Sequence, residues 1–216
     1  MTGTEAGCLP RLMLVTDRRR TRGRELVALV AQAVRGGVGI VQVREPDLPD
    51  DELRELVHRI RDEVDRSITI VVNGSLRVAR TLHTGLHMPA RAARLGDVDL
   101  GRAPYGRSVH DDAELRDALD DGVTYLLVGT IFGTESKPGR RAAGVAFVER
   151  VCRQSAPLPV FAIGGITVSR VPAVIHAGAH GVAACGAFLS ANEPQRVAEA
   201  MALGLEVATA ATRAAR

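Results

Sequence analysis

Aromatic side chains are scarce in this chain of 216 residues: they make up 3% of it, and tryptophan is absent. Proteins that bind single-stranded nucleic acid usually stack bases on aromatic rings, so the composition argues against that class. The net charge of +3 is helped by a basic segment that contains Arg18, Arg19, Arg20, Arg22 and Arg24. Such a basic segment could bind nucleic acid, but the alternative, a solvated loop that attracts an anionic small molecule, needs fewer assumptions. We therefore expect a small-molecule ligand and no nucleic-acid partner.

Long hydrophobic runs are also missing. No apolar stretch reaches the length needed to cross a bilayer, and the first residues lack the basic start and hydrophobic stretch of a secretory signal. The three cysteines, Cys8, Cys152 and Cys185, lack metal-ligand spacing and cannot all pair, which predicts reduced thiols. We expect a cytoplasmic protein with no membrane partner.

The first apolar run is not followed by the G-x-G-x-x-G turn of a dinucleotide-binding fold, because TDRRRTRG stands there. Eight short apolar runs alternate with amphipathic helical patterns, which is typical of repeated βα units. Strands are predicted at residues 11–16, 40–44, 68–73, 85–88, 105–108, 124–129, 159–163 and 181–185. Helices are predicted at 24–35, 50–65, 75–82, 111–121, 145–154, 168–177 and 193–210, and the segment 90–96 is too short for a full helix.

These runs are apolar at successive positions, so they should be buried on both faces, as in a parallel sheet covered by helices. Eight such units predict a single α/β domain, a closed (β/α)8 TIM barrel. We expect this domain to span residues 1–216, with its core at about 11–205 and tails at 1–10 and 206–216.

Polar side chains close several predicted strands, and in a parallel barrel the ligand groups come from those ends. Gln42 and Arg44 alternate with apolar neighbours, so both should point into the barrel mouth, either toward a ligand or as a satisfied polar layer. Asn73 ends the third strand, and Ser108 and His110 follow the fifth. Because histidine exchanges protons near neutral pH, His110 is a candidate acid and base, with a structural role in the loop as the alternative.

Glycine-containing turns follow the last two strands: Gly164 and Gly165 lie in IGGIT, and Cys185 and Gly186 lie in CGAF. Backbone N–H groups beside glycine approach an anion closely, and a helix start adds a favourable dipole. The loops after strands seven and eight commonly hold phosphate in this fold. The turns therefore predict a phosphate site, with tight helix–strand packing as the other reason for the glycines.

Seven motifs follow one another along the chain: LVTDR, QVRE, VVNG, GRSVH, GTIFGTESKPG, AIGGIT and GVAACGAF. In order and spacing they resemble the thiamin phosphate synthase and TenI family, from residue 12 to about 189. The resemblance implies a (β/α)8 barrel that binds a thiazole phosphate in the loops after strands six to eight.

Two activities divide that family. Synthase members join a pyrimidine pyrophosphate to the thiazole phosphate, using Mg²⁺ held by carboxylates and a lysine after the second strand. TenI members aromatise a carboxylated thiazole phosphate by moving protons, with neither metal nor pyrophosphate.

The residues that the synthase members use are replaced in this sequence. Pro46 stands in place of the lysine, while Gly74 and Ala92 stand in place of the two carboxylates. Without those oxygens a departing pyrophosphate loses most of its charge neutralisation. The NG and GRSVH motifs resemble the TenI branch, in which the histidine matching His110 is the proposed acid and base. Gly186 stands where the family tends to have serine, so a hydroxyl contact to the phosphate is lost while the backbone N–H is kept.

The resemblance thus implies a thiazole tautomerase, an isomerase that needs no cofactor, with His110 as the catalytic residue. Arg44 would pair with the substrate carboxylate through its planar guanidinium. Substrate contacts are implied at Gln42, Arg44, Asn73, Ser108, Thr134, Ser136 and Lys137. Phosphate contacts are implied at Gly144, Gly164, Gly165, Cys185 and Gly186. Lys137 could instead be a loop charge with no ligand.

Two other functions stay open. A synthase with rearranged ligands would bind Mg²⁺ through Asp47 or Asp97. A non-catalytic thiazole-phosphate-binding regulator would keep the phosphate site and lose turnover. The sequence leaves a homo-oligomer open in every case.

Overall fold

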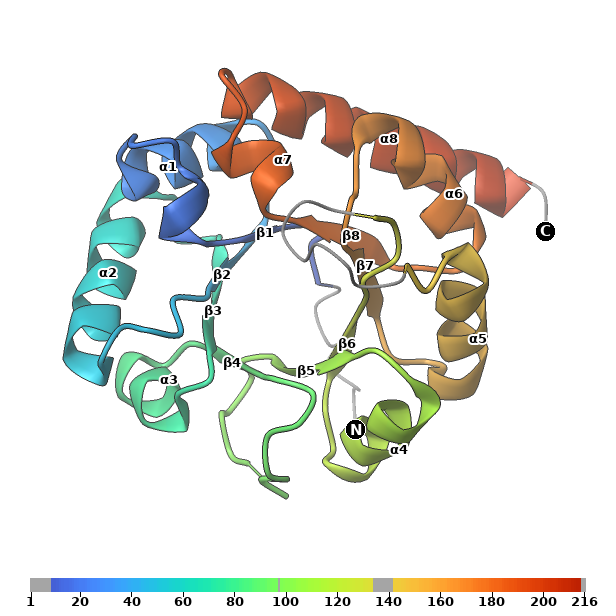
Figure 1. The fold of residues 1–216 in the computed structure, drawn as a ribbon, viewed down its shortest axis with the longest axis horizontal. Helices are drawn as coiled ribbons and strands as arrows, with labels where there is room; N and C mark the ends of the chain where they lie inside the picture. Colours follow the sequence, from blue (N-terminus) through green and yellow to red (C-terminus); the bar gives the residue numbers. More distant parts are fainter. Residues whose placement is uncertain (1–8, 97, 134–141, 215–216) are drawn as a thin grey trace, which may run out of the picture.

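The computed structural model describes residues 9–96, 98–133 and 142–214. Its eight parallel strands pair in chain order and β8 pairs with β1, so the sheet closes into the ring seen in Figure 1. The strands are β1 Leu12–Val15, β2 Ile40–Val43, β3 Thr69–Asn73, β4 Gly85–Met88, β5 Tyr105–Val109, β6 Tyr125–Val128, β7 Val160–Ile163 and β8 Gly181–Ala184. The predicted (β/α)8 barrel is confirmed.

The helices surround the ring of strands (Figure 1). They are α1 Leu26–Arg35, α2 Asp50–Glu63, α3 Leu76–Leu82, α4 Asp112–Asp120, α5 Val145–Ser155, α6 Val171–His176, α7 Gly186–Leu189 and α8 Pro194–Ala214, with the 3-10 turns η1 Arg18–Arg20 and η2 Val168–Arg170. The short α7 does not appear among the predicted helices.

The last helix is longer than predicted, because α8 continues to Ala214 through the segment expected to be a tail. Met201, Leu205 and Ala208 are buried at helical spacing, so the apolar stripe extends past residue 205. Arg11 donates from Nη1 to the Thr209 hydroxyl at 2.8 Å, which ties this part of α8 to the start of β1.

Alternate residues of each strand pack on opposite sides of the sheet. Leu12 and Leu14 join the apolar layer between strands and helices, whereas Met13 and Val15 join the layer inside the barrel. The inner layer is made of Met13, Val15, Ile40, Val71, Tyr125, Leu127, Phe161 and Ala183. The interior below the mouth is therefore a packed core that supports the strand ends, as is usual for this fold.

Between β4 and β5 the described residues form a loop and no helix, as the short segment 90–96 predicts. A buried arginine holds this loop: Arg107 donates from Nη2 to the carbonyls of Ala90 and Ala92 and from Nη1 to Asp121. Asp121 also accepts the backbone N–H of Leu95 at 2.7 Å. This polar cluster thus stabilises the loop at the place where a helix would otherwise follow β4 and pack on the barrel.

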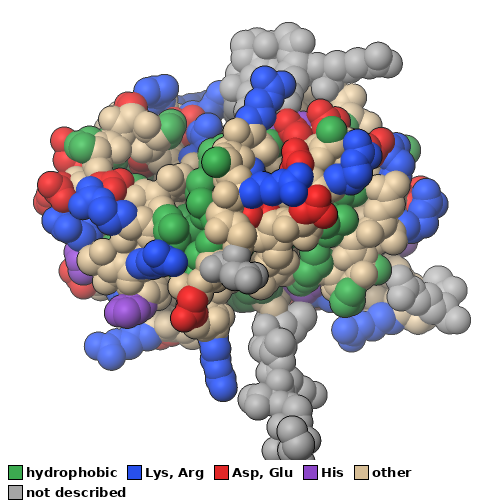
Figure 2. All heavy atoms as spheres, turned by 90° about the horizontal axis from the view of Figure 1, so that it is seen from below, with side chains coloured by type: hydrophobic (Ala, Val, Ile, Leu, Met, Phe, Trp, Pro, Cys, Tyr) green, Lys and Arg blue, Asp and Glu red, His purple; other side chains and the backbone are tan. Residues whose placement is uncertain are grey.

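Figure 2 shows the flank that faces downward in Figure 1, where basic and acidic side chains lie next to one another. On α4, Asp117 and Asp120 both form ion pairs with Arg94. Within the described residues, no helix combines the length and apolarity that crossing a bilayer requires.

Candidate functional site

A pocket of about 590 Å³ lies at the carboxyl ends of the strands. Nine of the predicted site residues line it: Gln42, Arg44, Asn73, Ser108, His110, Gly164, Gly165, Cys185 and Gly186. They lie in or directly after β2, β3, β5, β7 and β8, so the closure of the barrel brings together residues as far apart in the chain as Gln42 and Gly186. Their roles toward a ligand remain predictions.

Other predicted residues are placed differently. Gly144 does not line the pocket: it caps the start of α5, and its N–H donates to the Ile131 carbonyl at 3.0 Å, which leaves that N–H unavailable to an anion. Thr134, Ser136 and Lys137 lie outside the described residues.

Several lining residues are not predicted from the sequence, among them Thr16, Asp17, Arg20, Arg170 and Ser190. Thr16 and Asp17 directly follow β1, so the rule that polar strand ends line the site applies to them equally. Arg20 lies in the basic segment, where the sequence pattern offers no means of telling which guanidinium faces the barrel.

His110 is oriented by Glu114, four residues later at the start of α4. The Glu114 carboxylate accepts both the backbone N–H and the Nδ1 of His110, each at 2.8 Å. Asp111 caps the same helix by accepting the Glu114 N–H at 2.8 Å, which fixes the carboxylate beside the ring. Because a carboxylate accepts, the neutral ring carries its proton on Nδ1 and its lone pair on Nε2. Glu114 therefore sets which nitrogen of the neutral ring carries the proton.

His87 is fully buried and both its ring nitrogens have partners, as expected for a structural histidine. Nδ1 lies 3.0 Å from the Tyr125 hydroxyl, and Nε2 lies 2.9 Å from the Ser108 hydroxyl. Burial, with the nearby charges of Arg44 and Arg107, lowers the pKa of His87 to about 3, so the ring is neutral.

The polar group continues to Gln42, whose amide Nε2 lies 4.0 Å from the Met13 sulfur. Burial raises the pKa of Tyr125, and Gln42 opposes that shift in part. Ser108, which contacts His87, carries this buried polar group to the wall of the pocket.

Gly164 and Gly165 are required by their surroundings. Both have positive φ, at 101° and 61°. A Cβ on Gly164 would lie 2.5 Å from the Thr130 side chain, and one on Gly165 would lie 2.5 Å from the Gly133 carbonyl. The Gly164 carbonyl accepts the Phe132 N–H at 3.0 Å, and the Gly165 carbonyl accepts Arg170 at 2.6 Å. Tight packing around both glycines is therefore present, whereas their role toward an anion stays a prediction.

Cys185 lines the pocket as a thiol. Burial raises its pKa to about 12, so it stays protonated and adds no negative charge beside a bound anion. Cys152 is also free, in agreement with the expected reduced state, whereas Cys8 lies outside the described residues.

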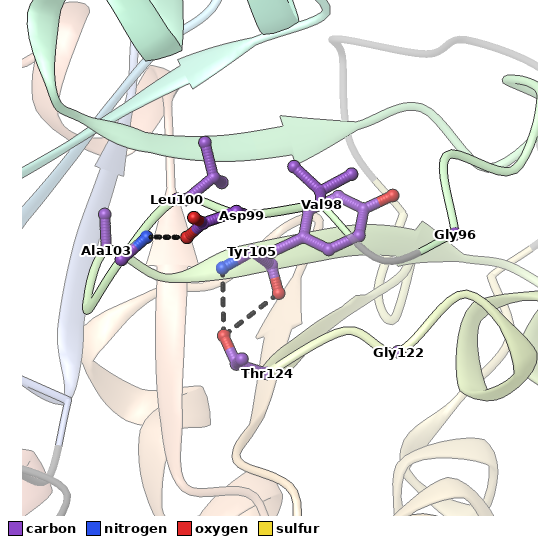
Figure 3. Close-up of a pocket in the computed structure, with 9 residues that line it drawn as sticks. Gly96, Val98, Asp99, Leu100, Ala103, Tyr105, Gly122 and Thr124 are labelled. Atoms are coloured by element: carbon purple, nitrogen blue, oxygen red, sulfur yellow. Dashed lines mark hydrogen bonds between the residues drawn. The ribbon is translucent and has the colours of Figure 1, made fainter.

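A second pocket, of about 290 Å³, lies at the opposite ends of β5 and β6 (Figure 3). Its wall includes Val98, Leu100 and Ala103, and the Thr124 hydroxyl bonds to the backbone of Tyr105. Among the described residues that line it, Asp99 is the only carboxylate. The amino ends of barrel strands generally serve stability, and this pocket offers no comparable set of polar groups.

A closed parallel barrel with helices around it defines a TIM-barrel protein, and the pocket lies where ligand sites usually lie in this fold. The family described as thiamine monophosphate synthase (TMP-TENI) matches residues 12–188. The chain belongs to this family of thiamin-biosynthesis enzymes.

Curated relatives and a solved structure agree with that assignment. The "Thiamine-phosphate synthase" of Mycolicibacterium gilvum (strain PYR-GCK) is 36% identical over 208 residues, 89% of this chain and 86% of the relative. The "Thiamine-phosphate synthase" of Thermobifida fusca (strain YX) is 36% identical over 212 residues, 93% of this chain and 94% of the relative. A thiamine phosphate pyrophosphorylase from Pyrococcus furiosus shares the fold, with a TM-score of 0.79 and 24% identity over 95% of this chain and 99% of that one.

Proposed function

We propose that this protein is a thiazole tautomerase of the TenI type, which aromatises a carboxylated thiazole phosphate. The observation that carries the proposal is the His110–Glu114 pair at the pocket, in which the carboxylate holds the imidazole by its Nδ1. The net reaction removes a proton from the ring carbon that bears the carboxylate and adds a proton to an exocyclic carbon. One group that first accepts and then donates a proton is sufficient for this shift.

In the proposed complex the ligand spans the pocket. Its phosphate lies at Gly164, Gly165, Cys185 and Gly186, and its carboxylate pairs with Arg44. His110 takes the proton at Nε2, while Glu114 stabilises the imidazolium that forms. The protonated ring then returns the proton to the exocyclic carbon. Ser108 and Asn73, which both line the pocket, orient the ring of the ligand.

A crystal soaked with phosphate or sulfate tests the phosphate end of this arrangement. We expect the anion within hydrogen-bond distance of the backbone N–H groups of the two turns after β7 and β8. An anion bound elsewhere in the pocket, with these turns empty, would remove the basis for the phosphate assignment.

The second candidate is a thiamin phosphate synthase, and the names of the curated relatives favour it over the tautomerase. That reaction needs Mg²⁺ and therefore free carboxylates. Asp17 is the one carboxylate among the described residues that line the pocket, and it pairs with Arg20. Asp47 pairs with both Arg18 and Arg19, at 2.8 and 2.9 Å.

No group of three or more His, Cys, Asp or Glu side chains in residues 9–96, 98–133 and 142–214 could hold a metal ion, and Asp97 lies outside these ranges. The donors in the described part of the chain thus do not fit Mg²⁺.

Assays of the purified protein discriminate between the candidates. With pyrimidine pyrophosphate, thiazole phosphate and Mg²⁺ we expect condensation to be undetectable or very weak, because Pro46, Gly74 and Ala92 supply no ligand. Tautomerisation should proceed and should survive a chelator. Strong Mg²⁺-dependent condensation would establish the synthase instead, and binding of thiazole phosphate without either reaction would indicate a regulator.

A further inference from the structure

The basic segment after β1 is folded back on the barrel by ion pairs. Arg18 donates to the Asp47 carboxylate through both terminal nitrogens, at 3.0 and 2.8 Å, and Arg19 donates to it at 2.9 Å. The buried Glu45 carboxylate accepts the backbone N–H of Arg18 at 3.1 Å. Two of the arginines are therefore committed to the loop after β2.

The same segment is also hydrogen-bonded to the carboxyl end of α7 and the residues that follow it. Arg24 donates to the carbonyls of Leu189 and Ala191, at 2.7 and 2.6 Å. The Ser190 hydroxyl donates to the Arg20 carbonyl at 3.1 Å. These bonds fix the backbone of the segment against the short helix that follows β8.

Arg20 alone of these arginines lines the described part of the pocket from this segment. Its Nε lies 3.4 Å from the Asp17 carboxylate, so the ion pair engages one edge of the guanidinium. Its Nη1 lies 3.6 Å from the point that a Cβ on Gly186 would occupy. With no side chain on Gly186, the guanidinium stands directly beside the first residue of α7.

A phosphate monoester dianion at this position needs positive charge, and the neighbouring helices supply little. α7 has four residues and η2 has three, so few peptide dipoles add up at their starts. Arg170, the other arginine near the turn after β7, is already engaged, because it donates to the Gly165 carbonyl at 2.6 Å and lies over the Phe132 ring. A guanidinium offers both the charge and a planar set of donors that matches phosphate.

We propose that Arg20 binds the phosphate of the ligand across Gly186 and so determines the preference of the pocket for a phosphate monoester. This inference rests on the proposed function, since it requires a phosphorylated ligand at the turn after β8. Arg20 supplies the charged contact at the place where residue 186 has no hydroxyl to offer.

The test measures binding of thiazole phosphate, inorganic phosphate and the unphosphorylated thiazole alcohol by titration calorimetry. Arg20→Gln should weaken the binding of thiazole phosphate by about 10- to 100-fold, which is the range for a lost charge-assisted hydrogen bond. The affinity for the alcohol should stay within about two-fold of wild type. Arg19→Gln is the matched control: it removes the same charge from an exposed side chain paired with Asp47, and the affinity should stay within about two-fold.

A compensating double variant tests the same role in the opposite direction, by restoring a phosphate contact. A Cβ on Gly186 would meet the Ser190 hydroxyl at 3.9 Å and nothing closer than Arg20, so a serine fits there. Gly186→Ser in the Arg20→Gln background should recover at least about three-fold of the lost affinity. Arg20→Lys keeps the charge and loses the planar fork, so its affinity for thiazole phosphate should lie between those of wild type and Arg20→Gln. This variant takes the place of Arg20→Gln in the test if Arg20→Gln does not fold.

The outcomes separate the two claims. Equal losses in the Arg19 and Arg20 variants, or equal losses for the phosphate and the alcohol, would overturn the role of Arg20, as would unchanged affinity in Arg20→Gln. If the wild-type protein binds neither thiazole phosphate nor inorganic phosphate, the proposed function falls and the role of Arg20 falls with it. Tight binding by wild type together with normal binding by Arg20→Gln would remove the role of Arg20 alone.

Discussion

Replacing His110 with alanine is expected to lower the rate of tautomerisation by about 100-fold or more, because a positioned acid and base typically contributes 10²- to 10⁴-fold. Affinity for thiazole phosphate should stay within a few-fold, since the imidazole acts on the ring while the phosphate is held at the other side of the pocket. Single-turnover rates with the carboxylated substrate measure the first effect, and calorimetry with thiazole phosphate measures the second.

The control for this variant is His58→Ala, which removes an exposed imidazole from α2 and should change neither quantity. Glu114→Gln provides an intermediate case. The amide oxygen still accepts from Nδ1, but the negative charge that stabilises the imidazolium is lost, so the rate should fall by less than in His110→Ala. If His110→Ala instead lost stability and ligand binding while turnover per bound substrate persisted, His110 would be a structural residue.

Much of the barrel could be predicted from the sequence because its strands are apolar on successive positions. Val41 and Val43 face the helices while Ile40 packs inside the barrel, so both faces of β2 are buried. The one polar residue of β2 is then predicted to line the mouth of the barrel. Gln42 is that residue: it is buried, and it also lines the pocket. The sequence left a ligand contact and a satisfied polar position open for it, and the ligand contact stays a prediction.

Other parts of the site depend on contacts between distant segments. Glu114 follows Asp111 at the spacing of a capping box, a local signal that could have identified the partner of His110. Arg20 gives no such signal, because only the closure of β8 against β1 brings it to Gly186. Gly144 resembles the other glycines in sequence, but its N–H donates to the carbonyl of Ile131, which lies in the loop after β6.

A buried ion pair helps to hold the loop between β4 and β5, and breaking it should have the largest effect on stability. The side chains of Arg107 and Asp121 are 1% and 0% exposed. Removing one member leaves a buried charge without its partner, which typically costs about 3–5 kcal/mol. Arg107→Met keeps the volume of the side chain and should lower the free energy of unfolding by about that amount. Urea titration followed by circular dichroism measures it.

Arg94→Met is the matched control, because its ion pairs with Asp117 and Asp120 are about half exposed. Exposed pairs contribute about 0–1 kcal/mol, so this variant should remain close to wild type. Similar losses in the two variants would show that burial does not set the contribution of the Arg107 pair.

The effect of Arg107→Met should also depend on pH, with a sign fixed by Asp121. Burial alone would raise the pKa of Asp121, but the Tyr105 hydroxyl, the backbone N–H of Gly96 and the Arg107 guanidinium donate to it, and the pKa falls below its usual value. A carboxylate with a lowered folded pKa stabilises the protein above its unfolded pKa of about 3.9 and loses that contribution as the pH falls through the folded value. The difference between wild type and Arg107→Met should therefore be largest near neutral pH and should narrow below about pH 4. A difference that stays constant from pH 7 to pH 3 would assign the loss to packing of the arginine side chain, with no contribution from its charge.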